Sequence, residues 1–491
     1  MKTQKVLTWI TAFLENALFS GVTFGWANLY PVLKDEQFFA ESCNSTMYEN
    51  GQNSSMVQSC NDQYETLTLV FIISVSVSMF SVLFIGFVLD KLGMWFVRTL
   101  LTNSAAAAMF LLASISYKSS FWLFIVFPVF ATCSFNVFIL NSQTANLFKK
   151  SRGSYTTSLA GAFNSGSVVY LLISHIYYNY NISFSTLIYI YASFLIVLNF
   201  RTFLLVPKYS VPFSLPDTYS YGYYELFNQV KNNRSNKSLN LKMLQSNKFD
   251  PDEMKLTQTL KKPFYWIGIL CALSFAFISN FYISILNILL PWVLKSNEVE
   301  DIKYYTDMMG IIQTSSCIFS FINSIVLDLL YRKTLKKHNN ETALLLTSSV
   351  GFYTSLTVLS LLNIANLIRF ASAQVFAMFM HAISRVWFAG AFQYYCSALY
   401  PSQHFGKLYG ISMIVCGTVN IIQYPIINYL TKNPENNFFV INGVLVGLCS
   451  FAFIHPSYLL HRYFKKKKSI HTKHKSDHSK VIINSVTAKV N

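Results

Sequence analysis

Long apolar stretches recur along the whole chain, and short polar segments separate each stretch from the next. A helix needs roughly 20 apolar residues to cross a bilayer, and each stretch is close to that length. The stretches cover residues 6–33, 66–89, 96–116, 121–147, 155–180, 185–206, 264–293, 304–328, 342–364, 367–398, 408–430 and 438–463. The pattern predicts an all-α polytopic membrane protein with twelve transmembrane helices.

One polar, basic insert at 207–262 divides the stretches into six and six. It is rich in Asn, Lys and Ser and has too few apolar residues to fold alone. Two six-helix bundles around a central loop are typical of secondary transporters. We therefore expect an N-terminal six-helix bundle at 1–206 with an outer loop at 34–65, a largely disordered cytoplasmic linker at 207–262, a C-terminal six-helix bundle at 263–464, and a basic cytoplasmic tail at 465–491. The first stretch lacks a signal-peptide cleavage site, so we expect it to remain as a membrane anchor.

Hydrophobic residues make up 53% of the chain and charged residues only 12%, which fits a membrane protein. The net charge of +17 does not indicate nucleic-acid binding, because the basic residues are unevenly distributed between loops. About 30 of them, Arg98 included, fall on the side of the two termini and about 6 on the other. By the positive-inside rule both termini are cytoplasmic. The basic run 465–468 stops translocation or contacts anionic lipid of the inner leaflet.

The outer loop supplies an independent indication of this orientation. It contains the sequences Asn44-Ser-Thr and Asn53-Ser-Ser, both acceptors for N-glycosylation. Cys43 and Cys60 flank these sites on the oxidising side, where either a disulfide or two free thiols can exist. The other six cysteines lie inside the apolar stretches, where they are small packing residues. None has the spacing of metal ligands, and we expect neither a metal nor another cofactor.

Two loops at corresponding places in the two halves share a short pattern. Residues 86–93 read Gly-Phe-Val-Leu-Asp-Lys-Leu-Gly, and residues 324–328 read Ser-Ile-Val-Leu-Asp before a basic segment. The first glycine would let helices approach closely, and each aspartate can cap a helix or form a salt bridge at the cytoplasmic rim. We interpret the loops as a conformational latch, the alternative being ordinary basic loops with a capping aspartate. The latch residues are Gly86, Asp90, Lys91, Gly93, Asp328 and Arg332.

The latch pattern resembles the signature of the major facilitator superfamily. Longer stretches resemble solute carrier family 43, whose members are facilitators of neutral amino acids or purine nucleobases. These stretches are Leu14-Glu15-Asn16 with Phe24-Gly25-Trp26, Gly161–Ser165, Arg201–Leu205 with Pro216–Gly222, and Tyr400–Gly410. Most of them look more like the equilibrative nucleobase branch, whereas Leu14-Glu15-Asn16 is similar to the amino-acid branch too. Asn164 stands where the nucleobase branch is expected to have an acidic residue.

Ionisable groups inside the apolar stretches are costly and indicate functional sites. Arg201 lies near the cytoplasmic end of its stretch, and we expect it to reach water. Glu15 and Arg385 lie deeper, and both face the central cavity in the fold that the resemblance implies. We predict an ion pair between them that links the two halves. The pair either opens and closes during transport or holds the bundles in a fixed register.

The chemistry of the cavity bears on the solute. A purine is flat and uncharged, so aromatic faces and amide side chains suit it. A zwitterionic amino acid needs separate partners for its carboxylate and ammonium groups, which an unpaired Arg385 and Glu15 would provide. The candidate cavity residues are Glu15, Phe19, Thr23, Trp26, Asn136, Asn141, Asn280, Asn287, His381, Arg385 and Phe388.

The chain has no Gly-x-x-x-x-Gly-Lys-Ser/Thr loop for ATP, and an arginine beside Glu15 would leave no carboxylate free for proton coupling. We therefore predict a monomeric, sodium- and proton-independent facilitator of purine nucleobases such as adenine, guanine and hypoxanthine at the plasma membrane. The main alternative is a facilitator of large neutral amino acids. A non-transporting sensor is a further alternative. A membrane enzyme using His381 is disfavoured because no catalytic partner accompanies that histidine.

Overall fold

The computed structural model describes residues 2–42, 61–148, 152–209, 211, 219, 221–223, 256–295, 299–337, 340–399, 405–432 and 434–468. Every regular element within these ranges is a helix. Eleven helices are long and apolar enough to cross a membrane, and Thr3–Ser20 with Val22–Asp35 form one further bent span. The prediction of an all-α membrane protein with twelve spans is confirmed.

The first half provides six spans. Its elements are α1 (Lys2–Glu15), η1 (Asn16–Ser20), η2 (Val22–Gly25), α2 (Trp26–Asp35), η3 (Ala40–Ser42), α3 (Asn61–Leu92), α4 (Met94–Ser114), η5 (Tyr117–Trp122), α5 (Leu123–Gln143), η6 (Thr144–Leu147), α6 (Arg152–Asn164), η7 (Ser165–Ser167), α7 (Val168–Tyr180) and α8 (Phe184–Leu205).

The second half follows a short helix, α11 (Leu256–Leu260), which precedes its first span. Its spans are built from α12 (Pro263–Leu294), α13 (Val299–Thr314), α14 (Ser316–Leu335), α15 (Asn340–Ala365), α16 (Ala371–Leu399), α17 (Phe405–Asn420), α18 (Gln423–Lys432) and α19 (Pro434–Ala452).

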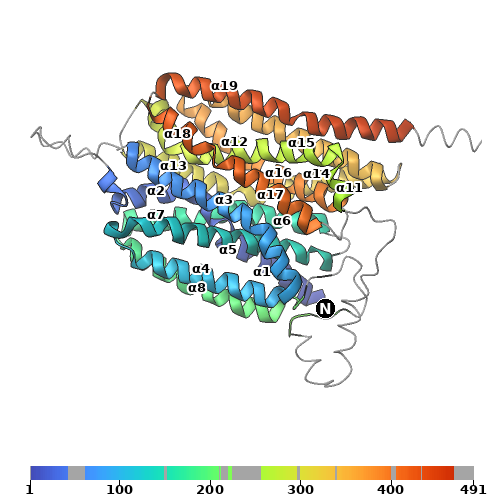
Figure 1. Cartoon of the computed structure of the whole chain (residues 1–491), viewed down its shortest axis with the longest axis horizontal. Coiled ribbons are helices and arrows are strands. Elements are labelled where there is room, and N and C mark those ends of the chain that lie inside the picture. Colours follow the sequence, from blue (N-terminus) through green and yellow to red (C-terminus); the bar gives the residue numbers. More distant parts are fainter. Residues whose placement is uncertain are drawn as a thin grey trace, which may run out of the picture.

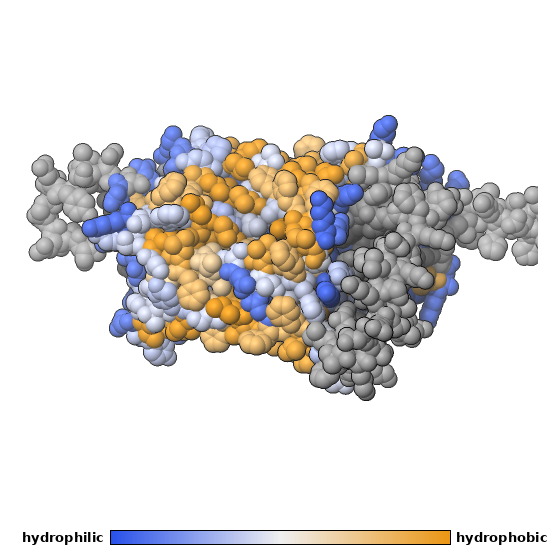
Figure 2. Space-filling model, turned by 60° about the horizontal axis from the view of Figure 1, so that its bottom comes forward, coloured by the Kyte–Doolittle hydropathy of each residue, from blue (hydrophilic) through white to orange (hydrophobic). Residues whose placement is uncertain are grey.

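The two halves lie side by side as bundles, with the blue and green helices below the yellow and red ones in Figure 1. Apolar side chains cover most of the middle of the surface seen in Figure 2. Phe200, Val444 and Ile311 are apolar side chains with more than 60% of their surface exposed. A surface of this kind is stable against lipid rather than water, so the apolar stretches form the membrane-facing belt.

The bundles are in contact at both ends. We call the end where α1 begins the termini end and the opposite one the far end (Figure 1). At the far end, the Asn28 amide donates to the carbonyl oxygen of Thr306 at 3.0 Å, and the Lys303 ammonium lies 4.0 Å from the Tyr178 ring. At the termini end, the Ser154 hydroxyl donates to Asp328 at 3.1 Å. The structure is therefore a conformation in which the halves touch on both sides of the membrane centre.

The first span is broken at its middle, and the break positions the functional site. The chain passes from α1 through a π-helical and a 3-10 segment, with a bend of 46°. The cause is a backbone-to-backbone crossing with the fifth span. A Cβ atom on Gly21 would lie 1.5 Å from the Phe163 carbonyl oxygen, and one on Gly166 would lie 2.7 Å from the Gly21 backbone. This crossing brings Phe24 and Asn164 to the same level of the bundle.

Several predicted features lie outside the described residues. They are the glycosylation sites Asn44 and Asn53, the cysteines Cys43 and Cys60, and most of the linker at 207–262. The other six cysteines are free thiols, and all except the half-buried Cys317 are buried. This agrees with the prediction that they are packing residues.

Candidate functional site

Arg385 of α16 reaches from the second half into the first. Its Nε atom donates to Asn164 Oδ1 at 2.8 Å, and its guanidinium lies 4.0 Å from the centre of the Phe24 ring. A cation over an aromatic face is attracted to it, more strongly when both are removed from water. Arg385 is only 9% exposed, and its Nη1 atom has no hydrogen-bond partner among the described residues. The Arg385 side chain thus contacts both bundles and retains an N–H group without a hydrogen-bond partner among the described residues.

Within the part of the chain that the structure describes, the hydrogen bond and the ring contact of Arg385 are with neutral groups. Among the described residues, the buried carboxylates are Glu15 and Glu65. Glu15 pairs with Arg98 and Arg201, and Glu65 accepts from Asn428 and Thr431 of α18. Neither carboxylate forms an ion pair with Arg385. A buried cation with neutral partners alone is costly, so this position favours a ligand with electron-rich acceptors.

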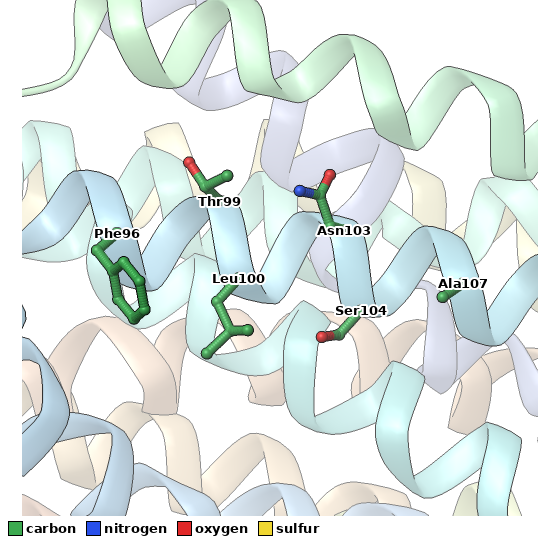
Figure 3. A pocket seen from close by; sticks show the side chains of 6 residues that line it. All are labelled: Phe96, Thr99, Leu100, Asn103, Ser104 and Ala107. Atoms are coloured by element: carbon green, nitrogen blue, oxygen red, sulfur yellow. The ribbon is translucent and has the colours of Figure 1, made fainter.

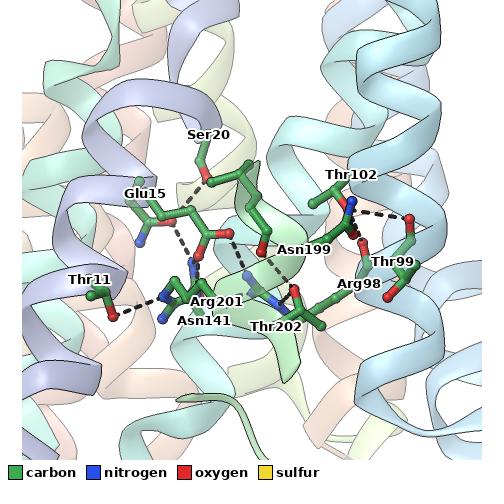
Figure 4. A network of polar contacts seen from close by, with 12 residues as sticks. Thr11, Glu15, Ser20, Arg98, Thr99, Thr102, Asn141, Asn199, Arg201 and Thr202 are labelled. Carbon is green, nitrogen blue, oxygen red and sulfur yellow. Dashed lines mark hydrogen bonds and ion pairs between the residues drawn. The ribbon is translucent and has the colours of Figure 1, made fainter. Parts of the chain in front are cut away.

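Glu15 belongs to a network enclosed in the first half (Figure 4). It forms ion pairs with Arg98 of α4 and Arg201 of α8. Asn141 of α5 donates to Glu15 at 2.9 Å and accepts from both arginines, at 2.9 and 3.0 Å. All four residues are buried. The network joins four spans of one bundle, and we infer that its role is structural.

Three predictions about charged residues are therefore wrong. Glu15 does not pair with Arg385, because Arg385 meets the first span at Phe24, nine residues beyond Glu15 and about 13 Å further along a helix. Arg201 does not reach water, since Glu15 holds it inside the bundle. Arg98 is not a loop residue but a fully buried residue in the second turn of α4.

His381 lies one turn before Arg385 on α16 and packs against α12. Its Nε2 atom is 3.2 Å from the Ser279 hydroxyl, and its ring lies 5.0 Å from that of Tyr282. Its Nδ1 atom has no hydrogen-bond partner among the described residues. Phe388, the next predicted residue on this helix, stacks on Phe275 at 3.8 Å in the core of the second half. Of these two, His381 is the one that keeps a free polar atom beside Arg385.

The predicted residues of the first span point in different directions. Thr23 is buried next to Phe24, and its hydroxyl has no partner among the described residues. Phe19 stacks on Tyr191 of α8 at 5.9 Å, away from the second half. Trp26 packs inside the first bundle, with its ring 5.5 Å from Phe71 and 5.4 Å from Phe127. Phe19 and Trp26 therefore pack within the first bundle and not against Arg385.

The predicted asparagines are dispersed rather than gathered around one ligand. Asn136 donates to Ser81 at 2.7 Å within the first half. Asn280 donates to Asn420 at 3.1 Å within the second half. Asn287 donates to the Ala27 carbonyl at 3.4 Å and so contributes to the far-end contact between the halves.

The predicted latch residues differ in their surroundings. Gly86 allows no close helix approach, since a Cβ atom there would meet nothing within 4 Å. Gly93 turns the chain with a φ of +81°, and the backbone amide of Met94 donates to the Lys208 carbonyl at 2.8 Å. Lys91 and Arg332 are exposed.

The two latch aspartates both interact with the opposite half, Asp328 through a hydrogen bond and Asp90 through the charge of a lysine. Asp90 interacts electrostatically with Lys407 in the first turn of α17. Asp328 accepts from Ser154 in the first turn of α6. Asp328 therefore lies at the start of a helix in the other bundle, where a negative charge is favourable.

Some residues of the site escaped the sequence analysis. Phe24 was noted only as part of a resemblance, although Gly21 and Gly25 have the Gly-x-x-x-Gly spacing that marks close helix packing. Arg98 lies within the predicted stretch 96–116 and could have been counted as an intramembrane charge. Glu65 was placed in the outer loop, and no local pattern indicates its contacts with α18.

A shallow groove on the outer face of α4 is separate from this site (Figure 3). Phe96, Thr99, Leu100, Asn103, Ser104 and Ala107 line it. Phe96, Leu100 and Asn103 are exposed on the surface of the first bundle. The groove thus faces outwards and does not lie between the halves.

Comparisons with known proteins agree with this architecture. The model of the Major Facilitator Superfamily matches residues 69–424. Equilibrative nucleobase transporter 1 from Bos taurus is 26% identical, over 95% of this chain and 97% of that protein. Large neutral amino acids transporter small subunit 3 from Mus musculus is 21% identical, over 91% of this chain and 92% of that protein. These relatives represent the two branches that the sequence analysis predicted.

A solved structure supports the fold independently. The human organic anion transporter MFSD10 (TETRAN) superposes with a TM-score of 0.59 at 11% sequence identity, covering 91% of this chain and 98% of that one. At this identity the similarity bears on the fold alone.

Proposed function

Since the chain belongs to the major facilitator superfamily and is a membrane transporter of that type, we propose that it carries purine nucleobases by facilitated diffusion. The observation that carries this proposal is Arg385, which bridges the two halves beside an aromatic ring and an amide. A planar, uncharged heterocycle can stack on the ring and accept hydrogen bonds from the guanidinium. The similarity to a nucleobase transporter points the same way.

The alternative substrate, a large neutral amino acid, has support from the second group of relatives. Its carboxylate would suit Arg385, but its ammonium group would need an anionic partner. Glu15 is occupied by Arg98 and Arg201, and the described residues place no other buried carboxylate beside Arg385. The site therefore favours the nucleobase.

Transport would proceed by alternating access. The halves rock about the central site, so that contacts at one end open while those at the other end hold. Asp328 with Ser154 and Asp90 with Lys407 would close the termini end. Asn28 with Thr306 would close the far end. We propose that the termini end is cytoplasmic, as the distribution of basic residues indicates, and that the protein resides in the plasma membrane.

We propose further that neither sodium nor protons drive the cycle. A proton-coupled carrier needs a carboxylate that can change its protonation state during transport. Glu15 is held by two arginines and an asparagine inside one bundle, and these contacts lie away from the interface between the halves. A site without a free carboxylate fits equilibrative movement.

The test is uptake into proteoliposomes containing the full chain. Radiolabelled adenine, guanine and hypoxanthine should enter in a saturable manner, and excess leucine or phenylalanine should not compete. Uptake should be the same with or without sodium and with or without a pH gradient. Leucine uptake that purines do not inhibit would replace this proposal with the amino-acid alternative. Binding without flux would indicate a sensor, and chemical conversion of the solute an enzyme.

A further inference from the structure

The outer edge of the Arg385 guanidinium keeps unsatisfied donors at the interface between the halves. Nε provides the only hydrogen bond that the side chain makes to the described residues. Nη1 is buried without a partner. The edge formed by the two Nη atoms therefore presents two parallel N–H donors to whatever occupies the site.

The geometry holds this edge in place. Asn164 donates through Nδ2 to the Ala160 carbonyl at 2.9 Å, which orients its Oδ1 atom towards Arg385. Phe24 lies against the guanidinium and limits its rotation. Because Asn164 is neutral, it positions Arg385 without cancelling its charge.

We propose that this edge selects solutes carrying two adjacent acceptors, which for a purine are the 6-carbonyl oxygen and N7. The inference rests on the proposed function and narrows it to 6-oxopurines such as hypoxanthine and guanine. Adenine carries an amino donor beside N7 instead, and that donor would face the N–H groups of Arg385. The same pairing underlies the recognition of guanine by arginine in nucleic-acid complexes, where it distinguishes guanine from adenine.

The proposal makes Asn164 a determinant of specificity that acts through Arg385. A carboxylate at the same position would form an ion pair with the guanidinium and satisfy much of its charge. The substitution Asn164→Asp should therefore weaken binding of acceptor-rich solutes more than binding of adenine. Arg385→Lys keeps the positive charge but loses the planar two-donor edge, so it should remove the preference.

The experiment measures inhibition of radiolabelled guanine uptake by hypoxanthine and by adenine in proteoliposomes of the full chain. In the unmodified protein, hypoxanthine should inhibit at a concentration on the order of tenfold or more below that of adenine, the lower part of the range for a two-donor arginine contact. Asn164→Asp should reduce this ratio roughly tenfold. Asn442→Asp is the matched control, since it places the same charge at a buried asparagine that bonds the Asn366 carbonyl instead of Arg385, and it should keep the ratio.

The outcomes distinguish failure of the 6-oxopurine preference from failure of purine transport. Equal inhibition by hypoxanthine and adenine in the unmodified protein, or an unchanged ratio in Asn164→Asp, overturns the selectivity while purine transport stands. Absence of saturable purine uptake overturns the proposed function itself. If Asn164→Asp does not fold, as judged by gel filtration in detergent, Arg385→Lys decides: an unchanged ratio there also overturns the selectivity.

Discussion

Glu15 of α1 is paired with Arg98 of α4, which lies 83 residues further along the chain within the same bundle. The buried charges of this transporter are thereby divided into two groups with different surroundings. In the first half, Glu15, Arg98 and Arg201 pair within one closed network. Arg385, by contrast, has neutral neighbours at the interface between the halves. Variants in the two groups can therefore separate effects on stability from effects on transport.

Replacing Glu15 by glutamine should destabilise the protein strongly. Arg98 and Arg201 would both remain buried without an anion, and breaking a buried ion pair on one side costs about 3–5 kcal/mol. Thermal unfolding in detergent would measure the loss. Glu341→Gln is the matched control, because Glu341 forms an exposed pair with Lys466 on the surface and such pairs contribute little. An equal, small change in both variants would show that the network does not stabilise the bundle.

Exchanging the charges of Glu15 and Arg385 should not restore function. The double variant Glu15→Arg, Arg385→Glu would place three arginines together in the first half and leave a carboxylate facing Asn164 and Phe24. We expect uptake to be absent in this variant and in both single variants. Recovery of uptake in the double variant alone would mean that the two residues do pair in another conformation of the cycle.

The sequence predicted the fold well because apolar length and loop charge are local properties of the chain. The partners of buried charges are not local properties, so the sequence did not predict them correctly. Glu15 was correctly identified as a costly buried charge, but its partner depends on the depth at which each span crosses its neighbours. The break at Gly21 and the burial of Arg98 set that depth. Neither follows from the pattern of apolar residues, so the Arg385–Asn164 contact was not foreseen.

Replacing Arg385 by alanine should abolish most transport while affecting stability little. The removed guanidinium is a buried charge with neutral partners, so its loss leaves only one acceptor, Asn164 Oδ1, unbonded. We expect purine uptake to fall at least tenfold and the unfolding temperature to stay within a few degrees. Arg98→Ala provides the contrast, since it breaks an ion pair and should lower that temperature clearly. A comparable loss of stability in Arg385→Ala would make its role structural.

The crossing at Gly21 should tolerate no added side-chain atom. In Gly21→Ala the new Cβ atom would lie 1.5 Å from a backbone carbonyl oxygen of the fifth span. The two spans would have to separate, at a cost above the roughly 1–3 kcal/mol typical of overpacking. Gly443→Ala is the matched control, because a Cβ atom there meets nothing within 4 Å. Gel filtration and thermal unfolding should show a clear defect in the first variant and none in the second.

Removing the carboxylate of Asp328 should open the termini end more often. Asp328 accepts a hydrogen bond from Ser154 across the interface between the halves. Cys317 lies three turns earlier on α14, where its backbone amide donates to the Ser165 hydroxyl of the first half at 3.2 Å. When the end opens, a water-soluble maleimide should reach Cys317 along the separated α6 and α14. We therefore expect Asp328→Ala to raise its labelling several-fold, as measured on the isolated peptide by mass spectrometry. Asp301→Ala, which removes an exposed carboxylate near the far end, should leave labelling unchanged, and the same result in Asp328→Ala would exclude a latch at this contact.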